Sequence, residues 1–498
     1  MSLKLVKSLD ENLKTIKDKL KESQDMVYRE LELQGGLRLA LVLIDGLSNM
    51  ANISNFVIEN LLGELGHVYV EENIDDLLNY LSRQTFSFVE AGTEKELDTI
   101  YNLILSGETL LLIDGLDTGI MLGSRAYPVR GIQESQTETL IRGPRDSFTE
   151  SLRMNTVLVR RRIKDTEFRM DSKDVGTRSK TDLAIMYIED IVDDKLLREV
   201  HRRIDNIDID AVLDSSTLEH LIEDNFYSLF PQIENTERPD SVAASLYEGR
   251  VCIIVDNSPF ALMIPATVGT LLQSTEDSYN RWTESSFIRI LRILAVILVL
   301  LPSALYVAIT AFNPGLLPTR LIYYVGASRI NVPFPAVVEA FLMEITMEII
   351  RQAGTRISGP IGSTIGIVGG LIIGQAAVEA GIVSALMIIV VALSAVASFA
   401  IPSYELSTAL RISRFGLILL AGIFGLYGVM LGLILLGSHI IVLDSFKVPY
   451  ASPYSGLGIE EGDIKDTLFR FPIQKLWRRP GFTNPKNKTR MRRRKDGS

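Results

Sequence analysis

The sequence has little cysteine and histidine and lacks the common catalytic motifs. Its single cysteine, Cys252, cannot form an internal disulfide and is interpreted as a core residue of an apolar strand. None of the four histidines lies at metal-ligand spacing from another. No P-loop, HExxH or GxSxG segment is present. We therefore expect a protein that is not an enzyme and that uses neither a cofactor nor a metal.

Charge is also scarce over one long part of the chain. Charged residues are dense up to about Arg292, sparse from there to Leu443, and dense again in the tail. The segment 293–312 carries no charge, and a run of about 20 apolar residues is long enough to cross a bilayer as a helix. We therefore predict an α-helical membrane domain over residues 286–445, with a large buried helical core as the alternative.

The apolar segments predict four membrane spans. Their approximate bounds are 289–312, 361–378, 382–401 and 415–442. Both termini then lie on the same side of the membrane. Six segments remain an alternative, because Arg320, Arg329 and Arg356 would otherwise lie in external loops, against the positive-inside rule.

The two ends of the chain indicate on which side they lie. Met1–Tyr28 contains no long apolar stretch of the kind that a secretory signal needs. The tail, residues 446–498, is basic and ends in "RMRRRKDGS". We therefore expect the soluble region and the tail on the cytoplasmic side, with binding of the tail to anionic lipid or nucleic acid as the alternative. The net charge of −10 is carried by the soluble region and disfavours nucleic acid as a partner.

The soluble half reads as a duplication. "LRLALVLIDG" (37–46) resembles "TDLAIMYIED" (181–190), and "SGETLLLIDG" (106–115) resembles "EGRVCIIVDN" (248–257). In the second pair a helix ends at glycine, a strand follows, and Asp-Gly or Asp-Asn favours a hairpin turn. The pattern predicts a soluble α/β N-terminal region of two related subdomains.

The predicted organisation follows from these repeats. It comprises an N-terminal helical extension over 1–34, a first α/β subdomain over 35–135, a connecting segment over 136–180 and a second α/β subdomain over 181–285. Within the connecting segment, Val157–Ile163 is predicted as a strand. Leu221–Asp240 is interpreted as a structured loop, with an interface or ligand loop as the alternative.

An unusually polar helix is predicted over 333–353, and Pro333 and Pro335 favour a helix start there. It carries Glu339, Glu344, Glu348 and Arg351. A lipid-facing span would not normally carry three glutamates. The helix therefore lies in the membrane interface as an amphipathic helix, lines a watery cavity, or packs on polar partners.

The segment "GPIGSTIGIVGGLIIGQAAVEAG" (359–381) places glycines at four-residue spacing. These are Gly362, Gly366, Gly370 and Gly374. Each costs a helix interior about 1 kcal/mol, which close helix packing in lipid offsets. The opposite face carries the candidate pore-lining residues Thr364, Val368, Ile372, Gln375 and Glu379. A dry constriction at Val368 would gate ions, and Glu379 would favour cations. Ordinary packing within one bundle is the alternative.

Four long segments resemble one family. "NTERPDSVAASLYEGRVCIIVD", "VPFPAVVEAFLMEITMEIIRQAG", "GIVGGLIIGQAAVEAG" and "IPSYELSTALRISRF" are similar to the A subunit of the GerA-type bacterial spore germinant receptors. The resemblance extends from about Gly35 to Pro453. It implies a multi-pass protein of the spore inner membrane, with the soluble domain facing the core. It also implies a transporter-like B subunit and a lipoprotein C subunit as partners, together with a homo-oligomer that conducts monovalent cations when nutrients bind.

Two other functions are kept as alternatives. A paralogue within the same superfamily accompanies the dipicolinate channel of spores and carries similar "PSYELS" stretches. A secondary transporter would also have Gly/Pro-rich membrane segments, but the sequence shows no inverted repeat.

Overall fold

The computed structural model describes residues 3–21, 23–32, 36–50, 53, 91–126, 138, 142–356, 374–454 and 466–491. The chain forms two compact units. The α/β unit comprises Met1–Glu223, Ile233–Pro265 and Thr483–Arg490, and the helical unit comprises Asp224–Gln232, Ala266–Phe482 and Met491–Ser498.

The α/β unit contains two antiparallel five-stranded sheets with the same topology. The first is built from β1 (Met26–Glu32), β2 (Arg38–Ile44), β3 (Ala91–Glu94), β4 (Thr109–Ile113) and β5 (Gly119–Leu122). The second is built from β6 (Phe168–Val175), β7 (Thr181–Ile188), β8 (Glu234–Thr236), β9 (Val251–Val255) and β10 (Ala261–Ile264). The strand orders are β1-β2-β4-β5-β3 and β6-β7-β9-β10-β8, so each strand has a counterpart in the other sheet. The prediction of two related α/β subdomains is confirmed.

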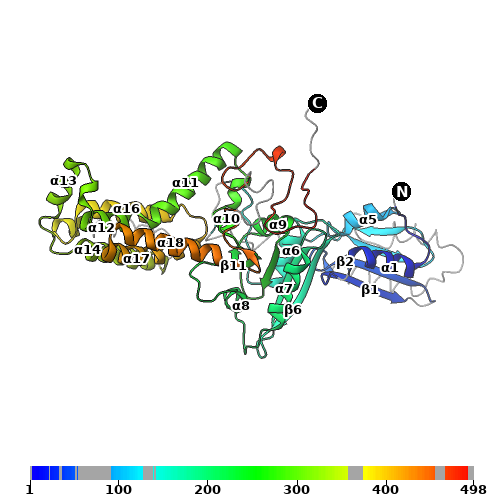
Figure 1. The fold of residues 1–498 in the computed structure, drawn as a ribbon. Helices are drawn as coiled ribbons and strands as arrows, with labels where there is room; N and C mark the ends of the chain where they lie inside the picture. The colour runs from blue at the N-terminus through cyan, green and yellow to red at the C-terminus, as the bar shows by residue number, and fades with distance from the viewer. Residues whose placement is uncertain are drawn as a thin grey trace, which may run out of the picture. The chain divides into compact units, whose positions relative to one another are not determined.

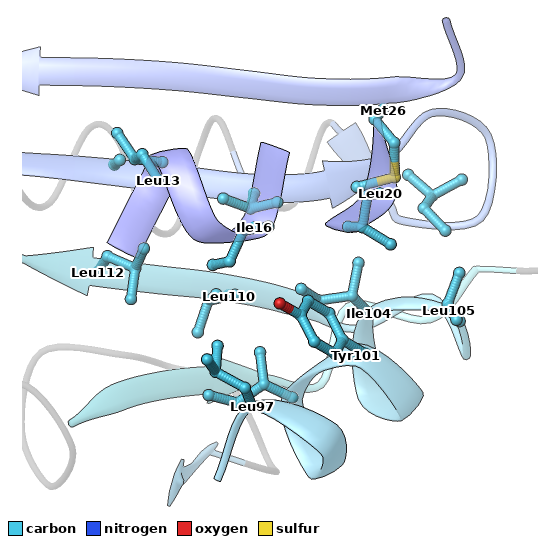
Figure 2. Close-up of a cluster of buried hydrophobic side chains, with 14 of the residues drawn as sticks. Leu13, Ile16, Leu20, Met26, Leu97, Tyr101, Ile104, Leu105, Leu110 and Leu112 are labelled. Atoms are coloured by element: carbon cyan, nitrogen blue, oxygen red, sulfur yellow. The ribbon is translucent and has the colours of Figure 1, made fainter. Parts of the chain in front are cut away.

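The first sheet has an apolar cluster on each face. Successive side chains of a strand point to opposite faces, so a strand such as β2 contributes to both clusters. Ala40, Val42 and Leu110 point toward two helices, α1 (Leu9–Leu20) and α5 (Leu97–Ile104). Figure 2 shows side chains of both helices meeting over this face of the sheet. Leu41 and Leu111 belong to a separate apolar cluster on the opposite face.

The second sheet is covered in a similar way. Its helices are α6 (Leu152–Arg160), α7 (Asp194–Asp205), α8 (Ser215–Ile222) and α9 (Pro239–Tyr247). Leu158 of α6 and Leu246 of α9 pack with Met186 and Ile254 of the sheet. Cys252 is buried in the same cluster.

The hairpin turns hold the helices at equivalent places. Asp114, in the β4–β5 turn, accepts a hydrogen bond from the Leu9 backbone N–H at 3.0 Å. Asp256, in the β9–β10 turn, accepts one from Leu152 N–H at 2.9 Å. Both helices therefore begin on an aspartate of a hairpin turn, and α1 is the counterpart of α6.

A pair of asparagines extends this equivalence. The Asn12 side chain accepts from Val6 N–H and donates to Val6 C=O, at 2.9 and 2.6 Å. The Asn155 side chain does the same with Thr149, at 2.7 and 2.5 Å. The described part of residues 1–34, which contains α1 and β1, therefore belongs to the first subdomain and is not an extension. Likewise, much of 136–180 belongs to the second subdomain and not to a connecting segment, since it contains α6 and β6.

The strand predicted at Val157–Ile163 is wrong, because most of this segment is helical, in α6. From this helix Val157 packs into the apolar cluster of the first sheet and Val159 into that of the second, so tertiary packing overrides their intrinsic preference for strands. The predicted loop Leu221–Asp240 contains the short strand β8 and includes the buried residues Phe230 and Ile233.

The helical unit contains one bundle and several short elements. Its α-helices are α10 (Val268–Leu271), α11 (Trp282–Leu300), α12 (Pro302–Ala311), α13 (Thr319–Arg329), α14 (Ala336–Arg356), α16 (Ala385–Ser398), α17 (Tyr404–Phe424) and α18 (Leu426–Val442). Short 3₁₀ turns are η4 (Thr275–Ser278), η5 (Pro314–Leu316) and η7 (Ile473–Lys475), and β11 (Asp444–Ser445) pairs with β12 (Val448–Pro449). Figure 1 shows α12, α14, α16, α17 and α18 side by side, and their apolar side chains share a core.

The helices differ from the predicted spans. The expected span over 289–312 is divided between α11 and α12, which are bent by 42°. The expected span over 415–442 is two helices that meet at Gly425, where φ is +60°. Gly428 and Gly432 of α18 lie against Leu420 and Leu417 of α17, so the two helices form an antiparallel hairpin.

Within the described residues, α17 alone is a single helix long and apolar enough to cross a membrane. The bent pair α11 and α12 adds a second if it is one broken span, and α16 and α18 are apolar but shorter. The expected span over 361–378 lies mostly outside the described residues, and α16 corresponds to the span expected over 382–401.

Candidate functional site

The polar row predicted on α14 is the most distinctive feature of the helical unit. Pro333 and Pro335 precede the helix, and the row runs along it from Glu339 through Glu344 and Glu348 to Arg351. Glu339 and Glu344 are 0% and 1% exposed. A buried carboxylate is stable only with charged or hydrogen-bonding partners, so the row must be read together with the helices around it.

Glu344 forms an ion pair in the centre of the bundle. Its Oε2 lies 2.5 Å from a terminal nitrogen of Arg414 on α17, and Arg414 is itself 1% exposed. The Ser303 hydroxyl of α12 donates to the other carboxylate oxygen at 2.8 Å. Three helices are therefore joined at one buried carboxylate, with no open surface around it.

Glu348 lies one turn further along α14 and is shared between two arginines. Its Oε2 is 3.1 Å from Arg351 on the same helix and 3.5 Å from Arg411 on α17. Arg411 also donates to the Ser407 and Thr408 hydroxyls at 3.2 and 2.9 Å. Glu344 and Glu348 thus form two successive links between α14 and α17.

Glu339 connects α14 to the start of α16. Its Oε1 accepts from the backbone N–H and the hydroxyl of Ser384, at 2.6 and 2.5 Å. Ser384 is the N-cap of α16, where unpaired N–H groups favour a negative charge. Tyr306 of α12 is hydrogen-bonded to the same hydroxyl at 2.9 Å, and Arg329 of α13 lies 3.7 Å from Glu339.

Of the three interpretations of the α14 helix, the contacts match packing on polar partners. Its charged side chains lie between helices and are paired there, which is not the arrangement of a helix lying in an interface. The row is therefore a set of links within the bundle. Among the described residues, no group of three or more His, Cys, Asp or Glu could hold a metal ion.

The predicted pore-lining face is only partly described. Thr364, Val368 and Ile372 lie outside the described residues, as do the packing glycines Gly362, Gly366 and Gly370. Gln375 and Glu379 lie on a helical turn at 374–379, and both are exposed. The Gln375 amide donates to the Glu379 carboxylate at 3.1 Å.

Gly374 lies on a different side of this turn and is buried. A Cβ built on it would meet Ile388 of α16 at 3.6 Å, an ordinary van der Waals distance. The turn therefore has a glycine against the bundle and two polar side chains pointing away from it. Gly381, with φ of +66°, follows the turn, and a Cβ there would lie 3.1 Å from the Asn331 carbonyl oxygen.

Sequence reasoning missed the partners of the polar row. Arg411 and Arg414 were visible in "TALRISRFG", where two arginines three residues apart interrupt an apolar stretch. Buried arginines in such a stretch require acidic partners, and the glutamates of α14 were the available ones. The hydroxyl partners Ser303 and Ser384 carry no comparable signal, because serine is common in apolar helices.

Comparison with known proteins gives a consistent set of relatives. A family model described as the Bacillus/Clostridium GerA spore germination protein matches residues 14–482. The chain is 40% identical to spore germination protein GerLA of Bacillus cereus, over 98% of each chain. It is also 40% identical to the uncharacterized membrane protein YfkQ of Bacillus subtilis (strain 168), over 99% of this chain and 97% of the relative.

One solved structure also matches. It is the N-terminal domain of the A subunit of the Bacillus megaterium spore germinant receptor GerK3. The identity is 32%, the match covers 53% of this chain and 96% of the other, and the TM-score is 0.43.

Proposed function

The chain belongs to the Bacillus/Clostridium GerA family of spore germination proteins, and we propose that it is the A subunit of a spore germinant receptor. Several relatives named as spore germination proteins align with nearly the whole chain, which supports a role in germination. The proposed partners are a transporter-like B subunit and a lipoprotein C subunit. The complex would sense nutrients and trigger ion release.

We further propose that the helical unit is embedded in the spore inner membrane, with the α/β unit on the core side. The apolar helices α16, α17 and α18 support this, as does the relative that is named as a membrane protein. The buried ion pairs of α14 and α17 fit the same environment. In lipid, bundles gain little from hydrophobic burial and depend on close packing and polar links.

The observation that carries the channel proposal is the division of the turn 374–379. Gly374 is buried, whereas Gln375 and Glu379 are exposed on the surface of the single chain. A carboxylate facing lipid is strongly unfavourable, so Glu379 needs water or another subunit beside it. A homo-oligomer in which this face lines a shared cation pathway supplies both. Thr364, Val368 and Ile372 would continue the same face.

Ion release from spores tests this function. Spores lacking their own chain would carry Val368→Ala, Val368→Phe or Glu379→Gln at matched protein levels. We expect Val368→Ala to leak monovalent cations without nutrient, because a wider apolar constriction admits water. Val368→Phe should blunt the nutrient response, and Glu379→Gln should slow cation release.

Val396→Ala is the matched control, since Val396 is exposed near the end of α16 and its truncation opens no cavity. It should germinate normally. Normal ion release in both Val368 variants would contradict the proposed conduction path.

A further inference from the structure

A short loop of the helical unit presents large apolar side chains to its surroundings. In the loop Asp224–Gln232, Phe226 and Tyr227 are 72% and 84% exposed, and Leu229 is also exposed. The two aromatic rings lie 4.3 Å apart. Clustered exposed apolar side chains of this size mark an interaction surface more often than isolated ones do.

The loop is held firmly in this shape. Asn225 N–H donates to the Gln232 side-chain oxygen, and the Gln232 amide donates back to Asn225 C=O, both at 2.8 Å. The Asn225 side chain also accepts from Tyr227 N–H at 3.1 Å. Asp224 accepts from Phe446 N–H at 2.6 Å. The aromatic side chains are therefore displayed by a closed, hydrogen-bonded loop.

The buried residue Phe230 shows at which end of the bundle helices the loop lies. Phe230 is buried in one cluster with Ala295 of α11 and Leu443, which directly follows α18. These two residues lie at the boundaries of the uncharged stretches, because Arg292 comes shortly before the first and Asp444 directly after the second. Near the same level, the Ser228 hydroxyl lies 3.0 Å from Nε2 of His439.

We propose that the loop Asp224–Gln232 inserts Phe226, Tyr227 and Leu229 into the headgroup region of the bilayer, as an interfacial anchor of the helical unit. Tyrosine and other amphipathic aromatic side chains are favoured at this depth because the ring is apolar and the hydroxyl is wet. This inference rests on the proposed membrane location.

Lipid is the partner that the surroundings favour. The end of α18, beside which the loop is held, also exposes Ile441 and Val442. The loop and the helix end thus present apolar side chains at one level. The only charged side chain of the loop, Asp224, hydrogen-bonds its own chain through Phe446. The loop and the end of α18 expose mainly apolar side chains and little charge, which favours contact with lipid.

Depth-dependent quenching tests the proposal on the full chain. The variant Tyr227→Cys would be labelled with a thiol-reactive fluorophore and reconstituted into vesicles of phosphatidylcholine and phosphatidylglycerol. Separate preparations would carry a nitroxide at the headgroup or deep in the acyl chains. Cys252 will stay unlabelled, because it is fully buried and burial raises the pKa of its thiol to about 12.

Two matched positions serve as references. Ile434→Cys places the label on α18 at a side chain that is 62% exposed, within the uncharged stretch. Ile473→Cys places it on η7, also highly exposed. The segment before η7 is tied to the first turns of α11 by the Ser286–Arg470 hydrogen bond at 3.0 Å. That position lies on the charged side of the boundary.

We expect the Tyr227→Cys label to be quenched about twofold more by the headgroup nitroxide than by the deep one, because an interfacial side chain lies closer to the headgroups. The Ile434→Cys label should show the reverse order, and the Ile473→Cys label should be quenched by neither. If Tyr227→Cys behaves like Ile473→Cys while Ile434→Cys is quenched, the loop inference is overturned and the membrane location stands.

If Ile434→Cys is quenched by neither nitroxide, the membrane location itself fails, and the loop inference with it. A Tyr227→Cys label that becomes shielded from aqueous iodide only when other spore membrane proteins are added would identify a protein partner. That result would also overturn the lipid assignment.

Discussion

The α/β unit and the helical unit use buried polar groups differently. In the α/β unit the clusters between each sheet and its helices consist of apolar side chains, as in the cluster of Ile16 and Leu110. Its buried Asp25–Arg160 pair links one subdomain to the other, with Arg160 stacked on Phe168. In the helical unit the Glu344–Arg414 pair lies inside the bundle itself. The sheets are therefore held by hydrophobic burial, whereas the bundle also needs specific polar links. This difference is expected if the bundle is surrounded by lipid.

The largest expected effect comes from removing one partner of the central pair. Arg414→Leu leaves Glu344 buried with only the Ser303 hydroxyl, and an unpaired buried charge costs about 3–5 kcal/mol. We expect the protein to accumulate poorly and to unfold at a lower temperature in detergent. The double variant Glu344→Gln with Arg414→Met should recover most of the loss, because it removes both charges at similar volume. Equal loss in the single and double variants would show that the pair is not the cause.

A smaller and pH-dependent effect is expected for a partly buried carboxyl of the α/β unit, that of Glu138. Burial raises the pKa of Glu138 to about 7, despite hydrogen bonds from the Thr236 hydroxyl and Glu237 N–H. Its pKa is higher when folded than when unfolded, so the folded state keeps a proton that the unfolded state has lost. Wild-type stability therefore falls as the pH rises from about 4.5 to 7.

Glu138→Gln keeps the shape and removes this titration. At pH 8 the variant should be more stable than the wild type by on the order of 2 kcal/mol, and the difference should vanish below about pH 4.5. Thermal unfolding of the full chain, followed by circular dichroism across this range, measures it. A difference that does not change with pH would contradict the assignment.

The smallest expected effect is that of Gly374→Ala, and a second glycine of the helical unit, Gly428, gives the contrast. Gly374→Ala should be neutral or stabilising by up to about 1 kcal/mol, because Ile388 leaves room for a methyl group and alanine favours the helix. Gly428→Ala is the contrasting variant. Its Cβ would lie 2.0 Å from the Leu420 carbonyl oxygen, so the α17–α18 hairpin must open. Comparable unfolding temperatures for the two variants would contradict this packing.

The hairpin turns and the α14 helix could be predicted from the sequence, because each depends on residues close together in the chain. The hairpin turns at Asp114 and Asp256 follow from Asp-Gly and Asp-Asn after short apolar strands, and the structure has both. The α14 helix and its polar row follow from the proline pair and the spacing of the glutamates. These features are local in sequence and carry a known geometric preference.

The remaining features depend on distant or backbone properties. The equivalence of α1 and α6 rests on Ser-Leu-x-x-Asn at 8–12 and 151–155, too short to identify without the hydrogen bonds. The break between α17 and α18 depends on the positive φ of Gly425, and a hydropathy profile does not predict backbone angles. Composition shows that Arg414 needs an acid but not that Glu344, a distant residue on another helix, supplies it.

Cation flux through the purified full chain is the most direct test of whether this chain forms a cation pathway. The chain and its Val368→Ala and Glu379→Gln variants would be reconstituted into vesicles loaded with K⁺, at equal protein density. We expect a K⁺ leak in Val368→Ala that exceeds that of the wild type about tenfold or more, and a smaller leak when Glu379→Gln is added. No flux above empty vesicles in any variant, with the protein inserted and oligomeric, would contradict a cation pathway formed by this chain.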